Sequence, residues 1–228
     1  MWVMRKRILP AAVLSVAALL ALSASASAEF IEIGKFDSAV KPGCPVMPGC
    51  TAISRTTGYQ ARAGNAATPM AAPKSGRIVA WTISLGRPNS KQIDFFDSKL
   101  GGVSQAQITV LQRSSDRRKK TTYAVVAQGE AMKLEPYFGR TTIFALRRSI
   151  PVKKNQVIAL TVPTWAPALA TGQASDVSWR ASRTKAQCDD TQGQTAQLEV
   201  KDSAAYDCLY KTARLTYSVT MVATPPRR

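Results

Sequence analysis

The sequence contains no histidine among its 228 residues. Histidine is the commonest general base near neutral pH and the commonest neutral metal ligand. Its absence excludes Ser-His-Asp and Cys-His hydrolases and removes the usual nitrogen ligand of a zinc site. Catalysis would have to depend on paired carboxylates or on a lysine-activated serine. No motif specific to either chemistry occurs, so we predict a non-catalytic protein that uses no cofactor and no metal.

Acidic residues are also few, at 14 against 31 lysines and arginines. The resulting net charge of +17 favours anionic partners such as envelope polymers, lipid headgroups or nucleic acid. It also keeps a protein soluble without any partner, and the sequence leaves both readings open. Surfaces that bind single-stranded nucleic acid interleave aromatic with basic side chains. That pattern is missing, so we expect no nucleic-acid partner.

Long apolar runs are limited to one, at the N-terminus. Arg5, Lys6 and Arg7 precede an apolar run over 8–22, which is shorter than the roughly 20 residues that span a bilayer. Ala26-Ser27-Ala28 then offers the small-x-small pattern of signal-peptidase cleavage. We predict a signal peptide over 1–28, cleaved after Ala28, and a secreted chain of net charge +14 with no transmembrane segment. The alternative is a retained membrane anchor.

Cysteine is scarce but even in number, with four residues in the predicted secreted chain. In an oxidising compartment, two disulfides are the default. Three pairings are possible, and proximity in the sequence favours Cys44 with Cys50 and Cys188 with Cys208. A zinc site is disfavoured because no paired CxxC spacing occurs.

Short segments rich in β-branched and aromatic residues, separated by Gly, Pro, Ser and Asn, indicate strands. They cover 77–85, 105–113, 121–128, 141–147, 156–162, 177–181 and 213–221, with edge strands expected at 29–33 and 51–55. So many strands in one chain predict an all-β fold, an antiparallel two-sheet β-sandwich of jelly-roll-like type. We expect one domain over 29–222, a long loop over 59–76, and a flexible basic tail over 223–228.

The segment Ser149 to Val162 reads Ile150-Pro151-Val152, then Lys-Lys-Asn-Gln, then Val-Ile-Ala-Leu. It resembles the L-P-V-x-x-G-D-x-I-x-L hairpin of many secreted bacterial sandwich modules, with Asn155 in place of the usual glycine. Together with Pro73-Lys-Ser-Gly-Arg-Ile-Val-Ala-Trp81, it is similar to a group of uncharacterised secreted bacterial β-sandwich proteins over about 73–165. The resemblance implies a fold and transfers no functional residue.

Two acidic pairs are candidate sites. Asp94 and Asp97 flank two phenylalanines in an expected connection, where they are either the carboxylates of a glycosidase or solvated turn residues. Asp189 and Asp190, beside Gln192 and Gly193, offer oxygen ligands for calcium without the alternating spacing of an EF-hand. Neither pattern is specific.

A basic cluster lies between two predicted strands, at the expected tip of a hairpin. It consists of Arg113, Arg117, Arg118, Lys119 and Lys120. Several like charges on a protruding loop can bind phosphates or other acidic groups of an envelope polymer. The alternative is a solvated tip that prevents edge-to-edge aggregation.

Trp165 lies between Pro163 and Pro167, where a regular strand is not expected. One interpretation is that it projects from a rim and stacks on sugar rings, with Trp179, Arg180 and Tyr137 as neighbours. Burial in the core is the other, and it is favoured for any individual tryptophan because of the large apolar area of the ring.

These observations predict a secreted, non-catalytic binding or surface-interaction module for an anionic or carbohydrate component of the cell envelope. One alternative is a carboxylate-dependent polysaccharide hydrolase. The other is a purely structural secreted protein. The sequence leaves the oligomeric state and the identity of the ligand open.

Overall fold

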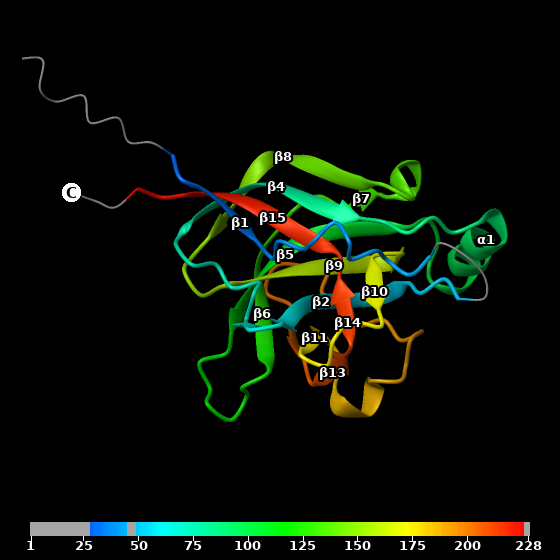
Figure 1. Ribbon diagram of the computed structural model, residues 1–228. Helices are drawn as coiled ribbons and strands as arrows, with labels where there is room; N and C mark the ends of the chain where they lie inside the picture. The colour runs from blue at the N-terminus through cyan, green and yellow to red at the C-terminus, as the bar shows by residue number, and fades with distance from the viewer. Residues whose placement is uncertain (1–27, 45–48, 226–228) are drawn as a thin grey trace, which may run out of the picture.

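A computed structural model describes residues 28–44 and 49–225 of the chain. The predicted signal peptide, apart from Ala28, and the last three residues of the predicted tail lie outside the described residues. The prediction of an antiparallel two-sheet β-sandwich of jelly-roll-like type is confirmed. Figure 1 shows the smaller sheet as the upper layer, lying over the strands of the larger one.

The smaller sheet has four strands and the larger sheet has nine. In spatial order, the smaller one consists of β1 (Phe30–Ile33), β15 (Tyr217–Ala223), β4 (Gly76–Ser84) and β8 (Thr141–Val152). The larger one runs β12 (Ser203–Ala205), β6 (Thr122–Gln128), β5 (Gln105–Arg113), β9 (Val157–Ala166), β2 (Ile53–Ala63), β11 (Val177–Ala181) and β13 (Cys208–Lys211). Two short strands, β3 (Ala66–Ala67) and β7 (Met132–Lys133), pair with β2 and β5. A separate pair joins β10 (Leu169–Thr171) to β14 (Ala213–Leu215).

The core lies between the two sheets, because each contributes one apolar face. Trp81 on β4 and Val219 on β15 are fully buried, as are Ile158 and Leu160 on β9. Tyr217 ties the layers together, since it belongs to β15 and its hydroxyl donates to the Ile158 carbonyl at 3.0 Å. A buried hydroxyl without such a partner costs about 1–3 kcal/mol, so this bond fixes how the sheets pack.

The larger sheet curls into a half-barrel. Its pairings contain register shifts in β2, β5 and β11, and such bulges bend strands and increase their twist. As a result, the two edge strands, β12 and β13, are joined by only Tyr206 and Asp207. The Tyr206 amide donates to the Thr121 carbonyl (2.9 Å), and the Asp207 amide donates to the Arg183 carbonyl (3.0 Å). The linker therefore connects the β6 side of the sheet to the β11 side.

Both predicted disulfide pairings are confirmed. Cys44 is bonded to Cys50, and Cys188 is bonded to Cys208. The second bridge connects the turn after η2 (Lys185–Gln187) to the edge strand β13. It closes a loop of about 20 residues and contributes roughly 3 kcal/mol in the chain-entropy description.

Two predictions about the segment around β2 are wrong. This strand was expected as an edge strand ending at 55, with a loop over 59–76, but it is central and continues to Ala63. Gln60, one of the polar residues that suggest a loop, is instead paired and buried. Gln60 is 1% exposed, and its side chain donates to the Ser178 carbonyl (2.9 Å) and accepts from the Leu215 amide (2.9 Å). Side-chain hydrogen bonds thus replace apolar contacts in holding this half of β2.

A ten-residue helix, α1 (Ser90–Lys99), replaces the connection expected around Asp94 and Asp97. Asn89 caps it, because its side chain accepts from the Gln92 amide (3.0 Å) while the Gln92 side chain accepts from the Asn89 amide (2.8 Å). This reciprocal arrangement is a capping box. None of the helix residues is buried. The sequence therefore shows no apolar periodicity that would predict this helix.

The segment that resembles a sandwich hairpin forms a turn, but its strands do not pair. β8 pairs with β4 in the smaller sheet, whereas β9 pairs with β2 and β5 in the larger one. Asn155 has φ 68°, a left-handed conformation that asparagine adopts more readily than most residues. The turn is therefore a corner between the two layers.

The predicted final strand is divided in the same way. β14 and β15 are separated by Thr216, and they belong to different sheets. The alternation over 213–221 correctly identified the inward-facing residues, but it carried no sign of the change of sheet.

The join between the two edges of the half-barrel can be tested at Tyr206. Its hydroxyl, in a fully buried side chain, donates to the Gln197 side-chain oxygen. Tyr206→Phe leaves that acceptor unpaired, so we expect the free energy of unfolding to fall by about 1–3 kcal/mol in urea denaturation. Tyr137→Phe is the matched control, because Tyr137 is half-buried outside this join, and it should change stability by less than about 0.5 kcal/mol. Equal effects of the two changes would contradict the role given to Tyr206.

Candidate anion-binding site

A cavity of about 240 Å³ opens at one end of the half-barrel. Five strands meet there: β5 ends, β6 and β9 begin, and the outer half of β2 passes beside β11. The cavity is lined by Tyr59, Gln60, Ala61, Thr68, Met70, Ala71, Arg113, Lys120, Thr121, Tyr123, Val157 and Arg180. Mouths of curled sheets are common places for ligand sites, because strand ends bring distant residues together there.

Three cationic side chains surround this cavity: Arg113, Lys120 and Arg180. Arg113 is the last residue of β5, and its Nε donates to the Lys120 carbonyl across the hairpin (2.8 Å). Arg180 lies on β11, and its Nη1 donates to the Tyr206 carbonyl (2.8 Å). Each guanidinium is thus held by a backbone oxygen and keeps further donors for a ligand.

Among the residues that the structure describes, no acidic side chain lines the cavity. Asp207 contacts a lining residue without lining the cavity itself: its carboxylate accepts from the Thr121 hydroxyl at 2.6 Å. In the part of the chain that the structure describes, none of the three cationic side chains forms an ion pair with a carboxylate. Their positive charge is therefore left for an external anion.

Tyr59 and Tyr123 form the floor of the cavity, and the fully buried Tyr206 packs against both of them. The rings of Tyr59, Tyr123 and Tyr206 have centroids 5.3–5.4 Å apart, and the Tyr59 hydroxyl donates to that of Tyr123 (3.2 Å). Burial raises the pKa of Tyr59, and Tyr123 adds to the increase, while Arg180 and Arg113 act in the opposite direction. Burial likewise raises the pKa of Tyr206. Tyr59 and Tyr206 therefore add no negative charge to the site near neutral pH.

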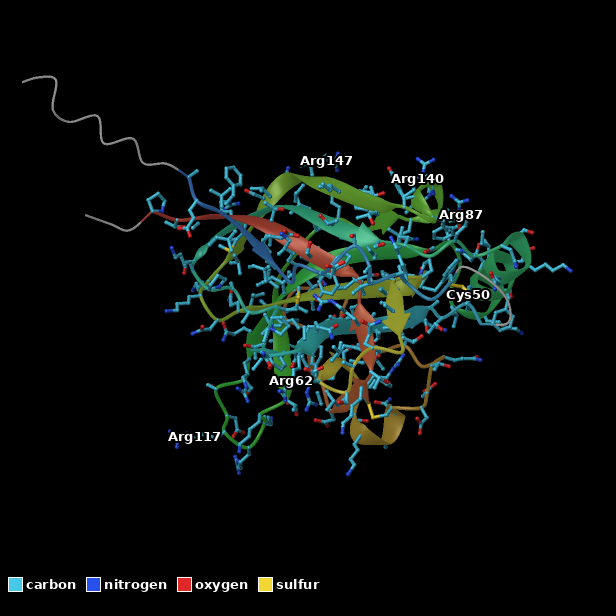
Figure 2. The ribbon with its side chains drawn as sticks, viewed as in Figure 1. Cys50, Arg62, Arg87, Arg117, Arg140 and Arg147 are labelled. Atoms are coloured by element: carbon cyan, nitrogen blue, oxygen red, sulfur yellow. A yellow bond between two sulfur atoms is a disulfide. The ribbon has the colours of Figure 1, made fainter. Side chains whose placement is uncertain are left out.

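The rest of the predicted basic cluster extends outward from the cavity on the β5–β6 hairpin. Arg118 pairs with Asp116 at 3.4 Å, and Arg117 and Lys119 are exposed at the turn. Figure 2 shows Arg117 at the tip of this loop and Arg62 on the same side of the molecule, while Arg87, Arg140 and Arg147 lie on the opposite side. The structure confirms that the cluster forms a hairpin tip.

The interpretation in which Trp165 projects from a rim is wrong. Trp165 is fully buried, and its indole nitrogen donates to Asp97 Oδ1 at 2.7 Å. Its ring packs against Phe96 and Phe138, with centroids 4.8 and 5.5 Å away. Strand β9 continues through this segment because Pro163 lies opposite the bulge in β2, where its missing amide hydrogen interrupts no ladder bond.

The other residues grouped with Trp165 do not assemble around it. Tyr137 packs edge-on against Phe144 under the smaller sheet, with ring centroids 5.0 Å apart. Trp179 is 4% exposed and stacks on Tyr210. It faces away from Arg180, because consecutive strand residues point to opposite faces. Of this group, only Arg180 reaches the cavity.

The two acidic pairs are widely separated. Asp94 and Asp97 lie on α1, at the right of Figure 1, whereas Asp189 and Asp190 follow η2, at the bottom. Asp190 Oδ1 accepts from the Gly193 amide (2.7 Å), so its carboxylate stabilises a local turn. No cluster of three or more potential metal ligands occurs within residues 28–44 and 49–225.

The sequence does not reveal this group of tyrosines. The residues around Tyr59 predict a loop, and Tyr206 lies in a two-residue linker without periodicity. Tyr123 was within a predicted strand, but nothing indicated its partners. These contacts depend on the curl of the sheet, which side-chain alternation does not report.

No protein-family model, curated protein or solved structure matches the chain. Among the described residues, no helix has the length and apolar character needed to span a bilayer. The site is therefore interpreted from its own geometry.

The buried phenols predict a steep loss of stability in alkali. Burial raises the pKa of Tyr59, Tyr206 and Tyr217 above the ordinary value near 10. Their contribution is fully present below that value and is lost as pH rises above it, because the unfolded chain releases protons that the folded chain retains. We expect the free energy of unfolding to fall by roughly 4 kcal/mol per pH unit above about pH 10, measured by urea denaturation.

The control is Tyr59→Phe, which should reduce that slope by about one third because one of the three phenols is removed. A stability that does not change between about pH 9 and 11 would contradict the burial of these hydroxyls.

Proposed function

We propose that the protein is a secreted, non-catalytic binding module for an anionic polymer of the cell envelope, and that acidic groups of this polymer enter the cavity at the end of the half-barrel. The observation that carries the proposal is the convergence of Arg113, Lys120 and Arg180 on one cavity with no acidic side chain in its lining. Guanidinium groups offer planar, paired donors suited to carboxylates, sulfates and phosphates.

A polymer fits this arrangement better than a free ion. The cavity holds one acidic group and its immediate neighbours, whereas the positive charge continues along the hairpin to Arg117 and Lys119. A chain with an acidic group on every repeat would contact both regions at once. Several weak contacts on one chain raise the overall affinity well above that of each contact alone.

An anionic partner is favoured over a neutral carbohydrate because the described tryptophans are buried. Trp81 and Trp165 are 0% exposed and Trp179 is 4% exposed. Stacking on a sugar requires an accessible ring face. The two disulfides support the assignment to an extracytoplasmic compartment, where such bonds persist.

The test is calorimetric titration of the chain over 29–228 with dextran sulfate, and with neutral dextran in parallel. We expect binding of dextran sulfate only, weakening as salt rises because exposed charges are screened. Arg113→Gln combined with Lys120→Gln should raise Kd by at least about tenfold, since two charge-assisted contacts are lost.

Arg140→Gln combined with Arg147→Gln is the matched control. It also removes two positive charges, but from the opposite side of the molecule (Figure 2). If both double variants weaken binding equally, the protein binds by net charge alone, and the proposed site is wrong. Polygalacturonate and polyphosphate, titrated in the same way, distinguish carboxylate from phosphate chemistry.

A further inference from the structure

A second cavity, of about 320 Å³, lies on the other face of β11. Trp179, Arg183 and Tyr210 form part of its wall, and Ser54 and Thr171 contribute from β2 and β10. Because Arg180 and Trp179 are consecutive on β11, they point to opposite faces, and the two cavities share no lining residue. Within 28–44 and 49–225, no acidic side chain lines this second cavity either.

Arg183 is a buried charge without a counterion. It is 4% exposed, and no carboxylate of the described chain forms an ion pair with it. Its Nη2 donates to the Ser54 carbonyl (3.0 Å) and its Nη1 to the Tyr210 hydroxyl (3.4 Å), while its Nε has no partner. Buried cations are normally paired, because removing them from water costs several kcal/mol each.

The wall beside Arg183 combines apolar surface with another unused donor. Trp179 stacks on Tyr210, with ring centroids 4.6 Å apart, and its indole nitrogen is buried without a partner. Gly58 makes room for this ring, since a Cβ there would lie 2.9 Å from Trp179 Cζ3. Arg183 and Trp179, which each have a buried nitrogen without a partner among the described residues, therefore line one cavity together with Tyr210.

We propose that this cavity binds a small organic carboxylate. The carboxylate pairs with the Arg183 guanidinium and supplies the missing negative charge, while the apolar body of the ligand packs on the half-buried ring of Tyr210. A single buried cation matches a single negative charge, and the volume is that of a small-molecule pocket. The exposed Lys211 lies at the same cavity and favours the same sign of ligand. The site is separate from the proposed polymer site.

The test uses benzoate as the probe and benzamide as its neutral counterpart of nearly the same shape. At about 10 mM, benzoate should raise Tm by about 3 °C or more through mass action, and benzamide should not. Arg183→Gln should weaken benzoate binding by at least tenfold in calorimetric titration.

A second variant keeps the test independent of Arg183's structural contacts. Thr171 is exposed and lines the cavity, so Thr171→Phe should leave folding intact and block benzoate by filling space. Arg113→Gln combined with Lys120→Gln should leave benzoate binding unchanged, which separates this site from the polymer site. Equal effects of benzoate and benzamide, no shift in Tm, or undiminished binding by Thr171→Phe would each overturn the proposal.

Discussion

The structure depends on the two-residue join that connects the edges of the curled sheet. Tyr206 and Asp207 link β12 to β13. Their amides donate to the carbonyl of Thr121, just before β6, and to the carbonyl of Arg183, just after β11. The Tyr206 ring then fills the interior against Tyr59 and Tyr123. Without this join, β6 and β11 would lie at opposite margins of an open sheet. Arg113 and Lys120, from the β5–β6 hairpin, and Arg180, from β11, line one cavity only because the margins have been brought together.

A row of buried hydroxyls attaches the irregular segment around Thr195 and Gln197 to this sheet. Thr109, Thr161 and Thr57 belong to β5, β9 and β2, and their hydroxyls are linked at 2.6 and 2.9 Å. The row ends at the Gln197 amide, which donates to Thr57 Oγ1 at 2.9 Å. The bulge at Arg55 extends this attachment, because its carbonyl accepts from the Thr195 amide. An all-apolar face would have specified no register for this segment, whereas each hydroxyl here has a directional partner.

The sequence predicted what is local in this fold. Alternation located β5 and β11 at their observed limits, and proximity correctly paired the cysteines. Prediction from the sequence failed where contacts between distant residues determine the structure. The outer half of β2 looks like a loop, because Gln60 is stabilised by backbone groups more than 100 residues away. Trp165 looks exposed between two prolines, but the bulge in the neighbouring strand admits Pro163. The sequence correctly placed the basic cluster at a hairpin tip. It did not predict the cavity next to this hairpin, because that cavity forms only when the sheet curls.

The two faces of the sheet differ in their electrostatic environment at β11. Arg180 faces a cavity whose other cations, Arg113 and Lys120, are exposed, so salt ions in solution reach and screen their interactions. Arg183, just beyond the strand, is enclosed by protein, and screening by salt acts weakly on such a charge. A guanidinium in that environment interacts more strongly with an anion, but it also loses more hydration. One side of β11 is therefore suited to many weak, salt-sensitive contacts, and the other to a single well-oriented one.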